Sequence, residues 1–411
     1  MLPIEASPLT NPQPTRFLGL APFLRASIAG ADLRPFIQEM LALAEQHSEN
    51  ANLWMNLAIA MLCMKQRELG LSIQGEALAL QRLYHLPASR QPARFKLLML
   101  MSPGDLAANT PLECLLEDSD IDLNCYYVSA GQPFTSPMPE HDALIVCLGE
   151  AGENLAYLDA LEEALADWPK PVINRPASIR MVERAMASQL LQDIPGLLMP
   201  PTSQVTRSEL QAVAAGTTDL ARLLPGCQFP VILRPHGSHA GRDLEKIGTP
   251  AEVAAYLARL EDDAFFLAPF VDYGGKDGLF RKFRVALIDG QAFACHMAIS
   301  ENWMIHYVNA GMYEAAEKRA EELAFMEDFA AFAKRHAEAL RAIQQRTGLD
   351  YLCLDGAETA DGQLLIFEID HAMVVHAMDL DEMFPYKQVH MQKVKDAFRS
   401  FLFSLLPPAA N

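Results

Sequence analysis

A pair of short apolar segments near the C-terminus constrains the fold more than any other part of the chain. Residues 351–370 read YLCLDGAETADGQLLIFEID. The segments 351–354 and 364–369 have the composition and length of β-strands, and the dipeptide Asp361-Gly362 between them is a turn signal. The sequence therefore predicts two adjacent strands joined by a short connection.

Three carboxylates lie at the ends of these two segments. Side chains two residues apart on a strand share a face, so Glu368 and Asp370 should point the same way, and Asp355 can face them from the first segment. Such a group needs a positive partner, and Mg²⁺ is commonly held by a few carboxylates together with substrate phosphates. A solvated hairpin with acidic ends is an equally good interpretation of these residues alone.

Length and charge exclude some classes of protein. The chain has 411 residues, enough for two or three domains, and its apolar share of 51% favours a packed globular protein over a disordered one. The formal net charge of −19 opposes broad binding to a phosphate backbone, because affinity for nucleic acid comes largely from basic surface. We therefore expect no nucleic-acid partner, although this charge is compatible with a local basic pocket for a nucleotide.

Cysteine usage and the apolar runs indicate a cytoplasmic protein. The seven cysteines are odd in number and show no CxxC spacing, which is typical of buried free thiols in a reducing compartment. The N-terminus lacks a basic segment followed by an apolar core, so we expect no secretory signal. The longest apolar run, near residues 53–64, is too short to span a bilayer, and we expect no membrane partner.

Residues 1–90 are expected to form an all-α domain, because the apolar pattern from 17 to 86 is helical. The segment 49–80, with Trp54 early in its first helix, resembles a tetratricopeptide repeat. Stacked helix pairs commonly bind peptides or proteins or mediate oligomers, so the resemblance is compatible with a peptide or protein partner and with a homodimer. A helical extension packed on the main domain explains the pattern equally well, because one recognisable unit is too few for an array.

Residues 91–175 have a different pattern, in which strand-like and helix-like segments alternate. The expected strands are 95–101, 121–128, 143–148 and 171–174, and the expected helices are 109–116 and 153–166. Alternation of this length predicts a layered α/β domain with a parallel sheet. The residues after the first strand read SPGDLAAN, which lacks the GxGxxG fingerprint and argues against a dinucleotide site there.

A series of further elements follows in a distinctive order. Asn174-Arg175-Pro176 opens a helix that carries Arg184, and Pro200-Pro201-Thr202 introduce a new strand. The next elements are FPVILRP at 229–235, HGSHAG at 236–241, FFLAPFV at 265–271, FRKFRVALI at 280–288 and WMIHYVNAG at 303–311. A long helix is expected from about 314 to 345, directly before the strand that ends at Asp355.

Together with 351–370, these elements resemble the ATP-grasp superfamily, and in particular its carboxylate–amine ligases of the glutathione-synthetase-like and ribosomal-protein glutamate-ligase-like groups. The resemblance covers roughly residues 95–400. It implies an α/β fold with a pre-ATP-grasp α/β domain at 91–175. It also implies an ATP-grasp domain of α+β type at 176–411, whose two lobes, 176–268 and 269–411, clamp ATP.

The resemblance also implies which residues bind the nucleotide. Arg234 stands where the family has a Lys that contacts phosphates, and it keeps the charge and can bind phosphate through two donors. The expected nucleotide-binding residues are Arg184, Arg234, His236, Ser238, Gly241, Ala268, Phe270, Val271 and Asp272, with Asp277 as a second candidate for the ribose contact. An ordinary hairpin loop at 236–241 is the alternative interpretation, and a surface arginine is the alternative for Arg184.

The residues expected to act on the transferring phosphoryl group are Arg284, Arg234 and Asn309. Arg284 matches the Arg of the family's Asp-x-Arg-Val element and would, with Arg234, stabilise the charge on that group. Asn309 matches an Asn near the substrate and phosphates. Lys282 replaces the usual Asp and shares a strand face with Arg284. Surface charge on a solvated antiparallel strand is the alternative interpretation of these two cations.

The resemblance makes Asp355, Glu368 and Asp370 metal ligands, with Asp370 in place of the usual Asn. It therefore implies ATP and Mg²⁺, with Mn²⁺ as an alternative ion. The additional carboxylate of Asp370 should strengthen metal binding and disfavour an empty site.

The implied reaction is ATP-dependent formation of an amide or peptide bond from a small-molecule carboxylate and an amine, through an acyl phosphate, on an amino-acid-like substrate or a peptide. One alternative is a kinase of the same fold that phosphorylates a small molecule. A second alternative is a helical-repeat binding protein with an inactive ATP-grasp lobe. The retained acidic trio argues against the second alternative, whereas Arg234 and the Asp missing before Arg284 keep it open.

Overall fold

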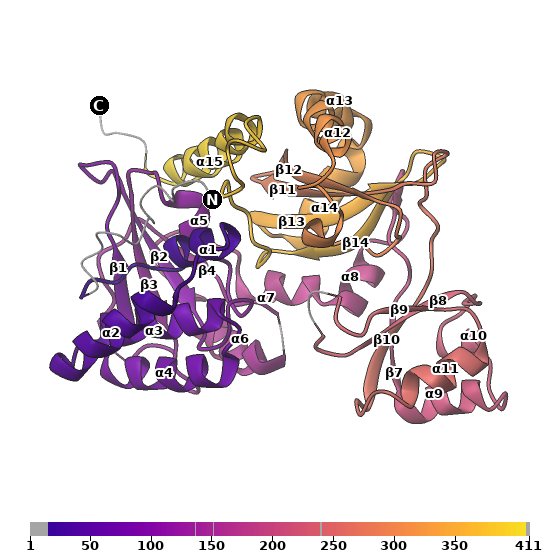
Figure 1. The fold of residues 1–411 in the computed structure, drawn as a ribbon, viewed down its shortest axis with the longest axis horizontal. Helices are drawn as coiled ribbons and strands as arrows, with labels where there is room; N and C mark the ends of the chain where they lie inside the picture. The colour runs from indigo at the N-terminus through magenta and orange to yellow at the C-terminus, as the bar shows by residue number, and fades with distance from the viewer. Residues whose placement is uncertain (1–14, 136, 151, 239–240, 408–411) are drawn as a thin grey trace. The chain divides into compact units, whose positions relative to one another are not determined.

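The computed structural model describes residues 15–135, 137–150, 152–238 and 241–407. The chain divides into two compact units. The first comprises Met1–Ile179, Leu349–Leu352 and Asp370–Asn411, and the second comprises Arg180–Gly348 and Cys353–Ile369. The described residues form a mixed α/β fold with three sheets (Figure 1). Because the segments 1–90 and 91–175 belong to one unit, their expected separation into two domains stays a prediction.

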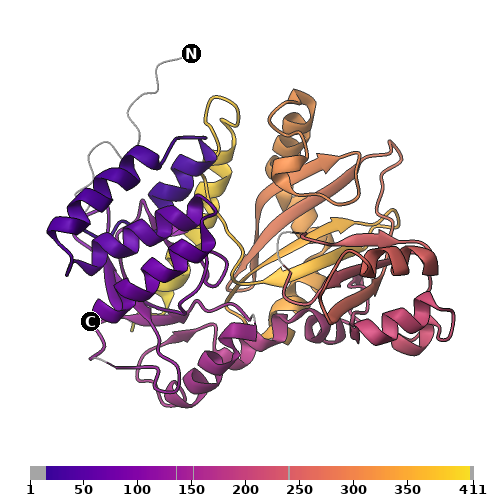
Figure 2. The same cartoon turned by 60° about the horizontal axis from the view of Figure 1, so that its bottom comes forward.

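Four helices open the first unit. They are α1 (Ala21–Ile28), α2 (Arg34–Gln46), α3 (Ala51–Cys63) and α4 (Arg67–Leu80), and Figure 2 shows them lying together. Asn50 caps α3, because its side chain accepts a hydrogen bond from the Leu53 N–H at 3.1 Å. The pair formed by α3 and α4 covers the segment that resembles a tetratricopeptide repeat. A single pair does not distinguish a repeat from a packed extension, so the repeat stays a prediction.

Residues 83–86 form a strand, β1 (Leu83–Leu86), and the expected helical pattern up to residue 86 is wrong at this point. Helix α4 ends at Leu80, and the backbone of the next residue, Gln81, is extended. Tyr84 is fully buried, and its hydroxyl donates a hydrogen bond to the Ala77 carbonyl at 3.0 Å. β1 is an edge strand that pairs antiparallel with β3, and its successive residues Tyr84 and His85 are buried and exposed, as expected for side chains on opposite faces.

The sheet of the first unit has the order β1-β3-β2-β4-β5. Its parallel strands are β2 (Phe95–Met101), β3 (Ile121–Tyr127), β4 (Ala143–Val146) and β5 (Val172–Ile173). The helices along this part of the chain are α5 (Glu113–Leu116), α6 (Leu155–Ala164) and α7 (Pro176–Ile179), and the 3-10 turn η1 (Gly152–Asn154) precedes α6. The predicted alternation of strands and helices is confirmed. The nearly continuous burial of β2 is typical of a parallel sheet covered on both faces.

A long helix, α15 (Lys387–Ser404), ends the first unit. Its Arg399 donates two hydrogen bonds to the carboxylate of Asp120, at 2.7 and 2.6 Å. This two-point pair fixes the helix to the residues directly before β3.

The second unit contains a four-stranded antiparallel sheet with the order β7-β10-β8-β9. Its strands are β7 (Ser203–Thr206), β8 (Val231–Pro235), β9 (Glu245–Ile247) and β10 (Ala264–Pro269). The helices α9 (Arg207–Ala214), α10 (Leu220–Leu223) and α11 (Pro250–Leu257) lie together on one side of it (Figure 1). Their apolar side chains form a core with Leu233 and Phe265 of the sheet. The opposite face of β8 and β10 is left to line a cavity.

A five-stranded sheet with the order β12-β11-β13-β14-β6 belongs to this unit except for Tyr351, Leu352 and Asp370, at the ends of two of its strands. Its strands are β6 (Leu197–Leu198), β11 (Phe280–Ile288), β12 (Gln291–Ser300), β13 (Tyr351–Glu358) and β14 (Leu364–Asp370). The predicted adjacent strands at 351–370 are therefore confirmed. Gly362 has a φ of +84° in the turn between them, and its N–H donates to the Thr359 carbonyl at 2.9 Å.

The expected single helix at 314–345 is instead three helices. They are α12 (Ala316–Glu327), α13 (Phe329–Arg335) and α14 (Ala337–Thr347), and they break at Asp328 and His336. The buried ring of His336 forms a hydrogen bond with Glu358 of β13, at 2.8 Å between Nε2 and Oε1. This contact holds the chain at the second break against the sheet. The remaining elements of the unit are α8 (Arg184–Leu190) and the 3-10 turns η2 (Arg180–Val182) and η3 (Tyr307–Asn309).

Within the described ranges, no helix combines the length and the apolar character needed to cross a membrane.

Candidate functional site

A cavity of about 180 Å³ lies in the second unit, between residues of its two sheets. Strands β8 and β10 line it from the four-stranded sheet, and β11 and β14 line it from the five-stranded sheet. Its charged and titratable lining residues are Arg184, Arg234, Lys282, His306 and Glu368. An apolar cavity with a few convergent polar groups is the usual form of a small-molecule site.

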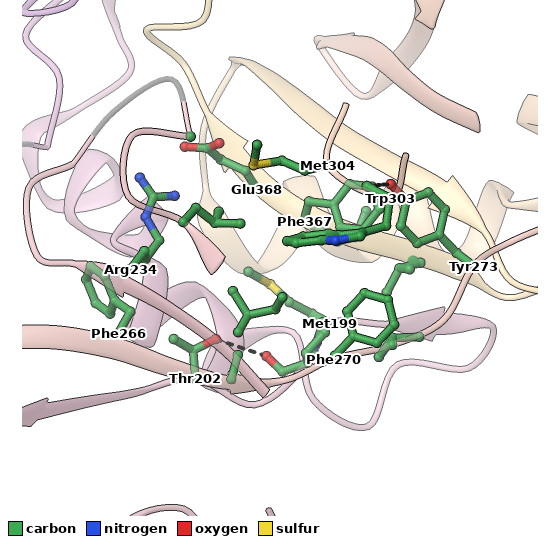
Figure 3. Close-up of a pocket in the computed structure, with 18 of the residues that line it drawn as sticks. Met199, Thr202, Arg234, Phe266, Phe270, Tyr273, Trp303, Met304, Phe367 and Glu368 are labelled. Atoms are coloured by element: carbon green, nitrogen blue, oxygen red, sulfur yellow. Dashed lines mark hydrogen bonds between the residues drawn. The ribbon is translucent and has the colours of Figure 1, made fainter. Parts of the chain in front are cut away.

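Aromatic side chains gather at one end of the cavity, and Figure 3 shows Phe270, Tyr273 and Trp303 there. The rings of Phe270 and Trp303 meet edge to face at 5.5 Å. The Tyr273 hydroxyl donates to the Trp303 carbonyl, and its ring lies 4.9 Å from Phe367. This arrangement forms a rigid apolar slot that suits a flat aromatic ligand group.

The predicted hinge residues Ala268, Phe270 and Val271 line the cavity at and beyond the end of β10. The Phe270 N–H already donates to the Pro230 carbonyl at 3.0 Å. A ligand would therefore have to form its hydrogen bonds with other backbone groups of the hinge.

Arg234 lies near the C-terminal end of β8, and the residue is only 7% exposed. Its Nη2 donates to the carbonyl and to the hydroxyl of Ser238, the latter at 3.3 Å. Its Nε has no hydrogen-bond partner among the described residues. Burial, together with the charge of Arg184, lowers the pKa of Arg234 to about 10, so the group keeps its charge at neutral pH. A buried cation with an unused donor is suited to an anion.

Arg184 and Glu368 form an ion pair at the cavity wall. Arg184 lies at the start of α8, and its Nη2 is 2.8 Å from Glu368 Oε1. Its Nη1 also donates to the Phe367 carbonyl at 3.2 Å. The Glu368 side chain remains 42% exposed, so this carboxylate is both paired and accessible.

Arg284 and Lys282 both hold the carboxylate of Asp355. Arg284 donates from Nε to Oδ1 at 2.7 Å and from Nη2 to Oδ2 at 3.0 Å, and Lys282 Nζ lies 2.7 Å from Oδ2. Burial alone would raise the pKa of Asp355, but the charges of Arg284 and Lys282 outweigh it and hold that pKa far below its ordinary value. Burial would likewise lower the pKa of Arg284, whereas the Asp355 carboxylate raises it overall. Asp355 and Arg284 are therefore both charged at neutral pH.

The predicted phosphate loop is only partly at the cavity. Gly241 lines it with a φ of +70°. His236 is exposed and packs against Phe266 with ring centres 5.0 Å apart, and Ser238 is buried against Arg234, so neither lines the cavity. His239 and Ala240 of this loop lie outside the described residues.

Three further predicted residues lie away from the cavity lining. Asp272 is exposed and accepts a hydrogen bond from the Gly274 N–H at 3.0 Å. Asp277 pairs with Arg281 at 2.7 Å. Asn309 accepts from the His306 N–H at 2.9 Å and thereby fixes the turn that presents His306 to the cavity. Their expected contacts with ribose and phosphate stay predictions.

The residues predicted to hold a metal ion do not fit such a site as they are arranged. Both oxygens of Asp355 are engaged by cations, and Glu368 is paired with Arg184. The Oδ1 of Asp370 accepts a hydrogen bond from the Ala372 N–H at 2.9 Å. Within the described part of the chain, no group of three His, Cys, Asp or Glu side chains could hold a metal ion. We therefore derive no chemical step through Mg²⁺ or Mn²⁺, and the ligand set stays a prediction.

Several cavity residues were not singled out from the sequence. Met199, Tyr273 and Phe367 carry no motif of their own, and Thr202 was expected only to introduce a strand. Each of them lines the cavity together with residues distant in the chain. Trp303 belongs to the element at 303–311, for which the sequence predicted a role only at Asn309. Its signal was the clustering of Trp, Met, His and Tyr in one connection, a composition that favours a binding wall over a solvated loop.

No protein-family model matches the chain. Similar solved structures include the VanG D-Ala:D-Ser ligase from Enterococcus faecalis, with 12% identity and a TM-score of 0.46 over 75% of this chain and 99% of that chain. A RimK-domain ATP-grasp protein from Sphaerobacter thermophilus has 16% identity and a TM-score of 0.41 over 75% and 99%. The D-alanine–D-alanine ligase from Bacillus anthracis, in complex with ATP, has 11% identity and a TM-score of 0.41 over 74% and 98%. Likenesses at this level do not assign an activity to this chain.

Proposed function

We propose that the cavity of the second unit binds ATP and that the protein is an ATP-dependent carboxylate–amine ligase. Arg234 carries the nucleotide assignment, because it is a nearly buried guanidinium at the cavity wall whose Nε lacks a partner among the described residues. Leaving such a donor unsatisfied is costly, and a phosphate oxygen would satisfy it. Arg184 and Lys282 line the same cavity, so its described lining has more positive than negative side chains.

The cavity is polarised in a way that suits a nucleotide. The adenine ring would lie in the aromatic slot near Phe270 and Trp303, and the phosphates would extend toward Arg234. Base stacking on aromatic side chains and charge-assisted phosphate contacts are the two interactions this geometry provides.

The ligase reaction takes its form from the resemblance of the sequence elements. A substrate carboxylate oxygen attacks the γ-phosphorus, the bond to the β,γ-bridging oxygen breaks, and ADP leaves with that electron pair. The amine nitrogen then attacks the acyl carbon, the bond to the phosphate oxygen breaks, and inorganic phosphate leaves. Catalysis of this kind depends on positioning and charge stabilisation, and it needs no activated serine or cysteine.

Residues of this chain supply distinct parts of that reaction. Arg234 and Arg184 hold the phosphates, and Arg284 acts through Asp355, which it fixes. Burial and the charge of Lys282 lower the pKa of His306, so its imidazole is neutral at neutral pH and can take up the proton of the incoming amine. The Mg²⁺ or Mn²⁺ requirement implied by the resemblance stays a prediction.

The substrate class is a small carboxylate and a small amine, such as amino acids or a peptide. None of the described lining residues favours a kinase, which would form a phosphorylated product without an amine. A peptide or protein partner at the N-terminal helices, and a homodimer, also stay predictions.

The nucleotide assignment is tested by calorimetric titration with a non-hydrolysable ATP analogue. Replacing Arg234 by Met should weaken binding by roughly tenfold to a hundredfold, the value of a charge-assisted hydrogen bond. Arg222→Met is the matched control, because Arg222 is exposed on α10 of the same unit. Equal affinities of wild type and Arg234→Met would contradict the assignment, as would a wild type that binds no analogue.

A further inference from the structure

Lys282 stands between a buried carboxylate and the cavity. Lys282 and Arg284 share one face of β11, and Asp355 lies on the neighbouring strand β13. The three bonds at 2.7, 3.0 and 2.7 Å from these cations use three of the carboxylate's roughly four lone-pair positions. Asp355 is therefore already coordinated by protein groups.

The charges of this cluster repel a metal ion and attract an anion. Two cations share one carboxylate, which leaves one net positive charge. A divalent ion at Asp355 would have to displace the ammonium of Lys282 and approach the guanidinium of Arg284. A phosphate oxygen, in contrast, would approach a surplus of positive charge.

Lys282 is the member of this cluster that reaches the cavity. Its side chain is 18% exposed and lies among the lining residues. The Asp355 side chain is 4% exposed, and neither it nor Arg284 is among the described residues that line the cavity. The group presented to a ligand is thus the ammonium and not the carboxylate behind it.

We propose that Lys282 takes the place of a divalent cation beside Asp355. Its ammonium, held by Asp355, contacts a phosphate group of the bound nucleotide, and Asp355 is not a metal ligand. This inference rests on the ATP-binding function proposed above. A lysine ammonium is a compact charge with three donors, which suits a phosphate oxygen.

The test compares nucleotide binding with and without divalent ions. A non-hydrolysable ATP analogue is titrated calorimetrically in EDTA and in Mg²⁺, against wild type, Lys282→Met and Lys282→Arg. In EDTA we expect Lys282→Met to bind at least about tenfold more weakly, the value of one charge-assisted hydrogen bond. The loss should be smaller in Mg²⁺, because the metal supplies the missing positive charge. Lys282→Arg should stay within about threefold of wild type, because it keeps the charge.

Arg281→Met is the matched control for this test. Arg281 lies next to Lys282 on the opposite face of β11 and is also ion-paired, with Asp277 and Glu321, but it does not line the cavity. The Arg281→Met substitution should leave nucleotide affinity unchanged. Lys282→Met should remain folded, because Asp355 keeps its two bonds to Arg284, and Lys282→Gln is a second neutral variant if it does not.

Each outcome decides the inference. If the neutral variants bind the analogue as tightly as wild type in EDTA, Lys282 is only a structural partner of Asp355 and the inference is overturned. If Lys282→Met loses as much affinity for the analogue in Mg²⁺ as in EDTA, Lys282 does not take the place of a metal ion and the inference is overturned. If wild type itself binds no analogue, the proposed function fails and this inference falls with it, which distinguishes that failure from the others.

Discussion

Gly241 lies so close to His306 that any side chain at position 241 would have to displace the imidazole. A Cβ atom added to Gly241 would lie 2.3 Å from Nε2 of His306, well below any normal contact, and the φ of +70° at Gly241 is strained for other residues. The loop over the cavity is therefore fitted to the turn that presents His306.

Gly241→Ala should weaken ATP-analogue binding by tenfold or more, on the order of the cost of moving the loop and straining its backbone. Gly237→Ala is the matched control, because Gly237 has a φ of +73° in the same loop but no atom within 4 Å of an added Cβ. The double variant Gly241→Ala/His306→Ala should recover part of the loss. Calorimetry measures all four proteins, and equal losses in the two glycine variants would show that the contact with His306 is irrelevant.

Asp355→Asn should destabilise the protein strongly. It leaves Arg284 and Lys282, whose side chains are about four-fifths covered, without their shared buried anion, and breaking one side of a buried ion pair typically costs about 3–5 kcal/mol. Asp277→Asn, which removes the exposed partner of Arg281 on the same strand, should change stability little. The midpoint of urea unfolding measures both. Similar midpoints for the two variants would contradict the burial and charge of the Asp355 cluster.

Glu358 should make stability depend on pH in the acid range. The hydrogen bond from His336 is the largest cause that lowers the pKa of Glu358 below its ordinary value of 4.5, and Arg335 adds to it. A carboxylate with a lowered folded-state pKa contributes stability above its unfolded pKa and loses it as pH falls through the folded pKa. The stability advantage of wild type over Glu358→Gln should therefore be full above about pH 5 and shrink below pH 4.5. Thermal unfolding across this range measures the difference, and a constant difference from pH 7 to pH 3 would refute the coupling.

Trp303 should report nucleotide binding by fluorescence. The chain has three tryptophans, and Trp54 and Trp168 belong to the first unit, whereas Trp303 lines the cavity. In a variant with Trp54→Phe and Trp168→Phe, ATP should change the emission of the remaining indole, because stacking alters its surroundings. Trp303→Phe in the wild-type background should abolish that change. An ATP-induced change that persists in Trp303→Phe would place the nucleotide elsewhere.

Strand patterns made part of this fold predictable. The turn at Asp361-Gly362 and the apolar runs beside it predicted the adjacent strands β13 and β14, because turn chemistry and period-two burial act locally. The same rule placed Lys282 and Arg284 on one face of β11. It could not show that both cations close on Asp355, because that depends on which strand lies next to β11.

Other features depend on contacts between distant residues and lack a local signal. The breaks at Asp328 and His336 carry neither Pro nor Gly, and the second is fixed by Glu358 in a later strand. The apolar pattern predicted helix at residues 83–86, where the structure has the strand β1. The strand forms through pairing with β3, a non-local contact that has no local signal. The bond from Tyr273 to the Trp303 carbonyl joins two separate connections of the second unit, so the aromatic end of the cavity became visible only in the fold.

The central claim is that this protein uses ATP to join a carboxylate to an amine. The most direct measurement supplies wild type and Arg234→Met with ATP, Mg²⁺ and amino acids singly and in pairs, follows ADP and phosphate release, and identifies products by mass spectrometry. We predict release of ADP and phosphate only when a carboxylate and an amine are both present, with an amide product, and its loss in Arg234→Met. A phosphorylated product formed without an amine would contradict the ligase reaction in favour of a kinase, and a wild type that neither binds ATP nor releases ADP with any pair would contradict the claim as a whole.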